Sequence, residues 1–207
     1  MFFMTNKGRA SMVDPQFESA LANRATPENS YVALREITSR GMIDLRGQTT
    51  DRKFLSAVKN VLGIDLPKTP RTSISFGDVK VLWLGPDQWL IVCGRDKAPA
   101  LAVELQKALD KIHSLVVDVS DMRSVIRIQG EGLNEVLMKC GSLDFTNADF
   151  VPGYVRRMRF AEIAALFNIV EQQVIDLYVF RSYAEYAWDI LLKASRKGSE
   201  VRLFTKI

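Results

Sequence analysis

The most continuous apolar pattern in the chain lies at residues 79–92, where two runs of branched and aromatic residues flank Gly85-Pro86-Asp87-Gln88. Gly and Pro favour a turn, so this stretch predicts a β-hairpin. Both arms are apolar at nearly every position, which is typical of strands covered on both faces. Trp83 and Trp89 flank the turn. We expect both in the core, and a cross-strand aromatic pair is the alternative.

The other apolar residues follow either the period of strands or the period of helices. Strands are predicted at residues 31–37, 42–46, 115–120, 124–129, 154–160, 173–180 and 201–204. Helices are predicted at residues 51–62 and 99–112, between Gly130 and Gly141, and after the capping box Ser182-x-x-Glu185. Residues 161–167 have helical propensity but the length of a strand, so they fit either element.

The order of these elements predicts an α+β fold built from two related halves of antiparallel sheet with packed helices. Residues 1–29 are expected to form a loosely ordered arm, with one short helix that begins at Asp14-Pro15. Residues 30–207 form the folded domain. A faint internal repeat divides this domain into halves at about residues 30–113 and 114–207.

Composition narrows the class of protein. The 207 residues carry 28 Lys and Arg against 24 Asp and Glu, a net charge of +4 that is spread along the chain and does not favour nucleic acid. The two cysteines lack Cys-x-x-Cys spacing, so neither a disulfide framework nor a metal framework is predicted. No apolar run has the length of a membrane span or of a signal-peptide core, so we expect a cytoplasmic protein that contacts no membrane.

The sequence offers no candidate catalytic, cofactor-binding or metal-ligating residues. His113 is the single histidine, neither cysteine has a histidine nearby in the sequence, and no glycine-rich phosphate loop occurs. Asp118 and Asp121 would lie on opposite faces of a regular strand. A salt bridge between this turn and Arg123 is therefore a simpler interpretation than a pair of catalytic acids.

Several residues are candidates for contact with a partner protein: Phe17, Leu21, Arg156, Arg157, Trp188 and Leu192. The first two share one face of the arm helix, which is too short to be stable alone. The two arginines fit either a partner's carboxylate or a solvated strand edge. Apolar residues cover more than half of the last helix, so this helix is either buried among the chain's own elements or partly docked on a second protein.

Four motifs occur in order along the chain. They are Trp-Leu-Gly-Pro-Asp-Gln-Trp-Leu-Ile at 83–91, Val-Asp-Val-Ser-Asp-Met-Arg at 117–123, Leu-Asp-Phe at 143–145 with Phe-Val-Pro-Gly at 150–153, and Arg-Ser-Tyr-Ala-Glu-Tyr-Ala-Trp at 181–188. Together they resemble the gamma subunit of heterotetrameric sarcosine oxidase over roughly residues 30–196. The chain departs from the family after Pro-Gly, where Val-Arg-Arg-Met-Arg at 155–159 replaces a strand that commonly carries Thr.

The resemblance implies a non-catalytic accessory subunit in a complex that oxidatively demethylates sarcosine to glycine, with tetrahydrofolate as one-carbon acceptor. It implies direct contact with an alpha subunit, and beta and delta subunits in the same complex. FAD, FMN, NAD, zinc and tetrahydrofolate would be carried by these other subunits. The implied fold is that of the aminomethyltransferase folate-binding domain, so the alternative function is a self-standing folate-binding protein.

Overall fold

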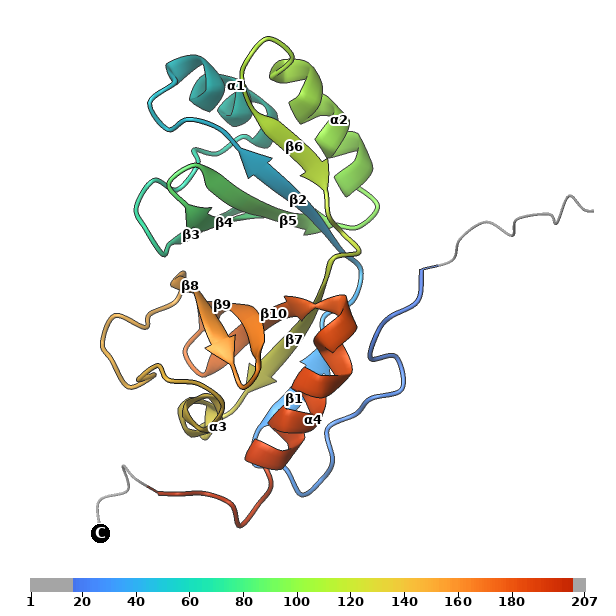
Figure 1. Ribbon diagram of the computed structural model, residues 1–207, viewed down its shortest axis with the longest axis vertical. Helices are drawn as coiled ribbons and strands as arrows, with labels where there is room; N and C mark the ends of the chain where they lie inside the picture. The colour runs from blue at the N-terminus through green and yellow to red at the C-terminus, as the bar shows by residue number, and fades with distance from the viewer. Residues whose placement is uncertain (1–16, 203–207) are drawn as a thin grey trace, which may run out of the picture.

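The computed structural model describes residues 17–202, which form two five-stranded antiparallel sheets and four α-helices (Figure 1). The first sheet has the order β3-β4-β5-β2-β6, with β2 Arg40–Arg46, β3 Ser73–Phe76, β4 Val79–Gly85, β5 Gln88–Gly94 and β6 Leu115–Asp118. The second has the order β1-β7-β10-β9-β8, with β1 Ala33–Glu36, β7 Arg123–Gln129, β8 Val155–Phe160, β9 Ile163–Glu171 and β10 Val174–Phe180. The predicted α+β class is confirmed.

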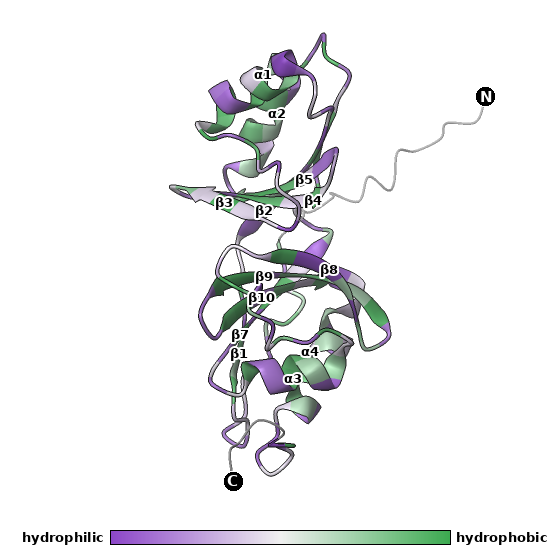
Figure 2. Cartoon of the chain, turned by 90° about the vertical axis from the view of Figure 1, so that its left-hand side faces the viewer, coloured by the Kyte–Doolittle hydropathy of each residue, from purple (hydrophilic) through white to green (hydrophobic). Residues whose placement is uncertain are grey.

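The two sheets pack face to face, and helices cover their outer faces (Figure 2). Helices α1 Arg52–Leu62 and α2 Ala98–Ala108 lie on the first sheet, and α3 Leu133–Cys140 and α4 Ala184–Ala194 lie on the second. The inner faces meet in an apolar layer of buried residues: Met42, Leu82, Leu84, Leu90, Val92, Val125, Val155, Leu166 and Tyr178. The central strands of each sheet are therefore buried on both sides.

The predicted hairpin is β4 and β5, the centre of the first sheet. Its two faces are covered as the sequence indicates, because Trp89 and Ile91 face the helices while Leu90 and Val92 face the second sheet. Trp83 lies opposite Trp89 in the strand register, but the ring that meets Trp89 is Phe54 of α1, with centroids 5.9 Å apart. The core interpretation of Trp89 is thus confirmed, and its aromatic partner comes from a helix.

Each sheet takes one strand from the other half of the sequence. β1 pairs with β7 in the second sheet, and β6 pairs with β2 in the first. Neither sheet is therefore built from one half of the sequence alone. The boundary between halves that we expect near residue 113 stays a prediction. This exchange ties the two layers together twice.

Helix α1 shows how local sequence sets an element's ends. Asp51 accepts hydrogen bonds from the amides of Lys53 and Phe54, and Gly63 ends the helix at φ 74°. A side-chain oxygen at the N-cap and a left-handed glycine after the last turn are the usual signals for these positions. Both ends agree with the prediction to within one residue.

Several predicted elements differ from the structure, and one that the sequence left open is decided by it. Residues 17–29 form turns without a helix, and the predicted helix start at Asp14 lies outside the described residues. Residues 161–167 belong to a turn and to β9, so the strand alternative is the correct one. The last helix has no side-chain cap, because Ser182 lies inside the 3₁₀ turn η1 Arg181–Tyr183 that precedes α4. Residues 201 and 202 are not in a strand, and residues 203–207 lie outside the described range.

The broad apolar surface of α4 is covered by the chain itself. Trp188 is 0% exposed and lies with Ala184, Ala187 and Leu191 in the core between the second sheet and its helices. Half-buried Leu192 packs against the same core. The prediction that Trp188 meets a partner is therefore wrong. Its burial follows from the second sheet, whose outer face needs cover along its whole width.

Replacement of Trp188 by Ala should lower the free energy of unfolding by about 3–5 kcal/mol, because it leaves a large cavity in a closed core. Replacement by Phe should cost far less, since the indole N–H has no hydrogen-bond partner among the described residues and its loss leaves nothing unpaired. Urea unfolding monitored by circular dichroism measures both changes. Tyr186→Ala on the exposed side of α4 is the control, and an equal loss there would contradict this account.

Candidate partner interface

Arg156 and Arg157 enter β8 side by side in sequence but point to opposite faces of the sheet, as the two-residue period of a strand requires. Arg156 is half-buried on the helix side, beside the buried Phe167 of β9 in the register. Arg157 is exposed on the inner face, where its Nη2 donates to Oε1 of Gln88 at 2.7 Å. Only Arg157 therefore reaches the first sheet.

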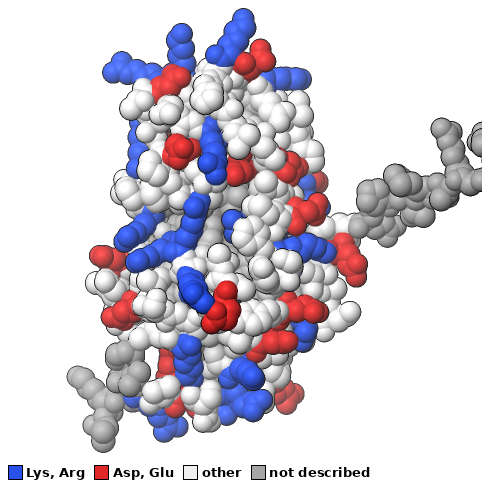
Figure 3. All heavy atoms as spheres, in the orientation of Figure 1, with Lys and Arg blue, Asp and Glu red and all other residues white. Residues whose placement is uncertain are grey.

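A polar relay continues from Arg157 into the first sheet. Nε2 of Gln88 donates to both carboxylate oxygens of Asp44, at 2.9 and 3.0 Å. The relay joins β8, β5 and β2 at the end of the apolar layer between the sheets. Figure 3 shows Lys and Arg side chains gathered over this side of the junction.

Arg123 lies at the same end of the junction, at the start of β7. Its guanidinium carbon stands 4.8 Å from the ring centroid of Phe180, and its buried Nε has no hydrogen-bond partner among the described residues. Burial, and then the positive charge of Arg157, lower the pKa of Arg123. Asp44 acts in the opposite direction on Arg123, and its carboxylate already accepts from Gln88, so a carboxylate from outside the chain would be stabilised by these two arginines.

Apolar residues extend from this polar end along β6. Leu115 and Val117 are 43% and 41% exposed, and they stand opposite Arg46 and Asp44 of β2 in the strand register. They lie on the inner face of the first sheet, where the second sheet does not cover them. An exposed apolar strip bordered by charged groups is typical of a protein interface.

Residues 17–24 connect the two layers on the outside. Phe17 is 47% exposed and its ring lies 4.2 Å from the guanidinium carbon of Arg95, which belongs to the first layer. The backbone carbonyl of Glu18 accepts from Arg181, and Leu21 is buried in the core of the second layer. The prediction that Leu21 faces a partner is therefore wrong. Leu21 anchors this segment, because the core beside α4 accommodates its side chain. Phe17 remains accessible.

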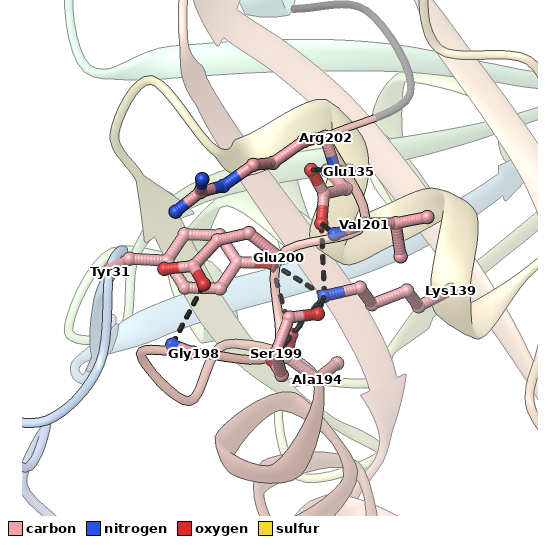
Figure 4. Close-up of polar contacts among 9 residues, drawn as sticks. All are labelled: Tyr31, Glu135, Lys139, Ala194, Gly198, Ser199, Glu200, Val201 and Arg202. Atoms are coloured by element: carbon pink, nitrogen blue, oxygen red, sulfur yellow. Dashed lines mark hydrogen bonds and ion pairs between the residues drawn. The ribbon is translucent and has the colours of Figure 1, made fainter.

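A clamp formed around Lys139 of α3 holds the C-terminal segment (Figure 4). Its Nζ lies 2.9 Å from the Tyr31 hydroxyl, 3.1 Å from the Ala194 carbonyl, 2.6 Å from the Ser199 carbonyl and 3.1 Å from Oε1 of Glu135. Glu135 in turn accepts from the backbone amides of Val201 and Arg202. Sequence reasoning missed this clamp, although Glu135 and Lys139 have the i, i+4 spacing of a helical ion pair.

The residues considered for chemistry are engaged structurally or exposed. Asp118 accepts from the amide and hydroxyl of Ser120, and Asp121 pairs with Arg95 rather than with the predicted Arg123. His113 is exposed at the surface. The backbone turn at 119–122 aims Asp121 toward the loop after β5, which sequence proximity to Arg123 could not indicate.

Both cysteines are free and buried. Burial raises the pKa of Cys93 and raises that of Cys140 to about 11, so neither thiol is activated as a nucleophile. Within residues 17–202 no group of three or more His, Cys, Asp or Glu side chains is arranged to hold a metal ion. None of the helices in this range combines the length and the apolar character needed to span a membrane.

The arrangement of sheets and helices defines a known class of fold. The solved structure of aminomethyltransferase T of the glycine cleavage system from Bartonella henselae superposes with a TM-score of 0.57 at 16% identity, over 79% of this chain and 46% of that chain. This likeness shows a shared fold. A chain in the heterotetrameric sarcosine oxidase of Corynebacterium sp. U-96, solved with pyrrole 2-carboxylate, superposes with a TM-score of 0.76 at 26% identity, over 86% of this chain and 91% of that chain.

Sequence comparison gives the particular family. Residues 46–197 match the model of the sarcosine oxidase, gamma subunit family. The sarcosine oxidase subunit gamma of Corynebacterium sp. strain U-96 is 34% identical over 173 residues, which are 81% of this chain and 81% of the relative. That of strain P-1 is 33% identical over 111 residues, 52% of each chain. The chain belongs to the sarcosine oxidase gamma subunit family, and the resemblance noted in the four motifs is confirmed.

Replacement of Lys139 by Met should release the C-terminal segment and lower the free energy of unfolding by about 1–3 kcal/mol, because several acceptors lose a charged donor. Hydrogen exchange at residues 195–202 and urea unfolding measure the two effects. Lys193→Met, an exposed change on α4, should alter neither. Unchanged exchange in the Lys139 variant would show that the clamp does not hold the segment.

The clamp also has a predictable dependence on pH. Burial opposes the charge of Lys139, but its hydrogen bonds to Tyr31 and Glu135 outweigh burial and raise its pKa. A raised lysine pKa means that the folded state holds the proton more tightly than the unfolded state. The stabilisation from Lys139 should therefore be complete at neutral pH and disappear only as the pH rises through the lysine's raised pKa.

Proposed function

We propose that this chain is a non-catalytic accessory subunit of a heterotetrameric sarcosine oxidase. The observation that carries the proposal is the likeness along almost the whole chain to a component of such a complex, 0.76 in TM-score over 91% of that component. The family relationship supports the same assignment. The complex would oxidatively demethylate sarcosine to glycine, with tetrahydrofolate as the one-carbon acceptor.

In this proposal the subunit supports turnover of the complex by keeping the folate-binding part of a partner subunit in its functional shape. The direct partner would be the alpha subunit, with beta and delta in the same assembly. FAD, FMN, NAD, zinc and tetrahydrofolate would be bound by those subunits. A two-layer body tied by exchanged strands is a stiff support, which suits a role in holding a neighbouring chain in position.

The surface proposed for the partner begins at the Arg157 end of the junction and follows the exposed strip of Leu115 and Val117. The excess positive charge around Arg123 and Arg157 would receive a carboxylate of the partner, and the apolar strip would supply buried area. Phe17, half-buried Arg156 and half-buried Leu192 remain candidates at the margins. Substitution of Arg157, described below, tests this surface.

Co-purification tests the function itself. A tagged form of this chain, expressed with the neighbouring reading frames of its source, should bring down three other subunits with flavin absorbance and sarcosine-dependent oxygen uptake. The competing function is a self-standing folate-binding protein of the aminomethyltransferase-like fold. A monomer that binds folate tightly by itself, with no associated flavin, would replace the proposal by that alternative.

Replacement of Arg157 by Glu should weaken assembly about tenfold or more. It removes the positive charge that receives the partner's carboxylate and places a second carboxylate beside it, which repels it. The chain should stay folded, with a loss of about 1 kcal/mol in its free energy of unfolding, since the side chain is exposed but gives up its hydrogen bond to Gln88. Arg52→Glu makes the same change of charge at the start of α1, away from the junction. Equal assembly of both variants, measured by analytical ultracentrifugation of reconstituted complex, would remove Arg157 from the interface.

A further inference from the structure

A second polar end of the junction between the sheets contains a cavity of about 200 Å³. Its walls come from both sheets: Arg40, Lys80 and Val92 from β2, β4 and β5, the β3–β4 turn with Asp78, and Val125, Arg127, Asp176 and Tyr178 from β7 and β10. It lies on the opposite side of the apolar layer from the Arg157 relay. The cavity therefore belongs to this chain alone and is separate from the proposed partner surface.

The cavity walls carry more positive than negative charge. Arg127 holds Asp176 in a two-point ion pair, with Nε–Oδ1 at 2.6 Å and Nη2–Oδ2 at 2.9 Å. Asp78 pairs with Lys97 outside the cavity at 2.7 Å. Both wall carboxylates are thus neutralised by their own partners. Arg40 and Lys80 remain as two cations in excess.

Lys80 is the less solvated of these two cations. It is half-buried, and no hydrogen bond or close ion pair of its Nζ is found within the described residues. Burial, more than any neighbouring charge, lowers its pKa, while Asp176 acts in the opposite direction. A half-buried ammonium without a close acceptor is a costly arrangement unless an anion reaches it.

Tyr178 supplies an unpartnered donor in the same wall. The residue is 2% exposed, yet its hydroxyl has no hydrogen-bond partner in the described part of the chain. The hydroxyl is not one of the fully buried unpaired atoms, so it is open to water or to a ligand in the cavity. Its neighbour in the wall, Lys80, would bind the same acceptor.

The wall is mainly polar, with Ser75 also lining it, and two valines supply an apolar part. Val92 and Val125 are buried side chains of the apolar layer that reach the cavity from opposite sheets. A simple hydrated anion such as phosphate gains nothing from such a surface. An organic anion with a short apolar body gains the burial of that body as well as the charge interaction.

We propose that this cavity binds a small organic carboxylate, with the carboxylate on Lys80 and the Tyr178 hydroxyl and the apolar body against Val92 and Val125. The volume admits a molecule of a few heavy atoms, since a water molecule takes about 30 Å³ of liquid. The charge of Arg40 at the mouth favours entry of the anion. The ligand would cross-link the two sheets at the end where no relay joins them.

The proposal does not depend on the enzyme complex. The probe is propionate labelled with ¹³C, added to the purified full-length chain and, separately, to the complex if one forms. Line broadening of the probe measures binding. Acetate and inorganic phosphate are the comparison ligands, with binding expected in the order propionate, acetate, phosphate.

Two variants assign the signal to the cavity. Lys80→Met keeps the length of the side chain without its charge and should weaken propionate binding about tenfold or more, as expected for loss of a charged hydrogen bond. Tyr178→Phe removes only the hydroxyl and should weaken it several-fold. Lys111→Met and Tyr183→Phe make the same changes at exposed positions and should leave binding unaltered. Unfolding midpoints confirm that each variant is folded.

Four results would overturn the proposal. They are no propionate binding to the folded wild-type chain, binding unchanged by Lys80→Met, binding unchanged by Tyr178→Phe, and phosphate binding tighter than propionate. The first would mean that water satisfies Lys80 and Tyr178. The last would mean that the site selects a hydrated inorganic anion. Comparison of wild type with Lys80→Met in the complex excludes carboxylate sites on other subunits, because the change affects this cavity alone.

Discussion

Face-to-face burial of two antiparallel sheets is the interaction on which the rest of the structure depends. The inner layer, from Met42 and Leu90 on one sheet to Leu166 and Tyr178 on the other, removes both inner faces from water. Helices then have to cover the outer faces, since each strand also presents apolar side chains there. This double burial explains why β4, β5 and β10 are apolar at almost every position. It also explains why the apolar face of α4 that carries Trp188 is buried against the second sheet and is not exposed to a partner.

The same strand periodicity places polar or charged groups at both ends of the inner layer. Residues that follow the apolar pattern inward reach Arg127 and Asp176 at one end and Asp44 and Gln88 at the other. Water cannot fully reach these positions, so the charges are neutralised within the chain or by something outside it. At the Arg157 end a relay joins the sheets. At the Lys80 end the neutralisation is incomplete. The two ends therefore differ in structure: a polar relay closes one, and a cavity with an unpaired lysine lies at the other.

Family membership gives this architecture a context. In this chain, which shares the fold of aminomethyltransferase T, several acidic side chains have structural contacts. Asp118 fixes a turn, Asp121 fixes Arg95, and Glu135 fixes the C-terminal segment. Ion pairs that fasten one layer or segment to another make a rigid body.

The sequence by itself determined the elements whose signals are local. The hairpin follows from Gly85-Pro86 between apolar runs, α1 from the cap at Asp51 and the stop at Gly63, and the family from four motifs in order. Tertiary structure alone decided which faces these elements cover. Trp188 looks the same in sequence whether it meets a partner or a core, because periodicity gives a direction from the helix axis and not the identity of what lies there. Strand β3, the exchange of β1 and β6, and the cavity beside Lys80 each depend on residues far apart in the chain, whose meeting is set by packing and not by local preference.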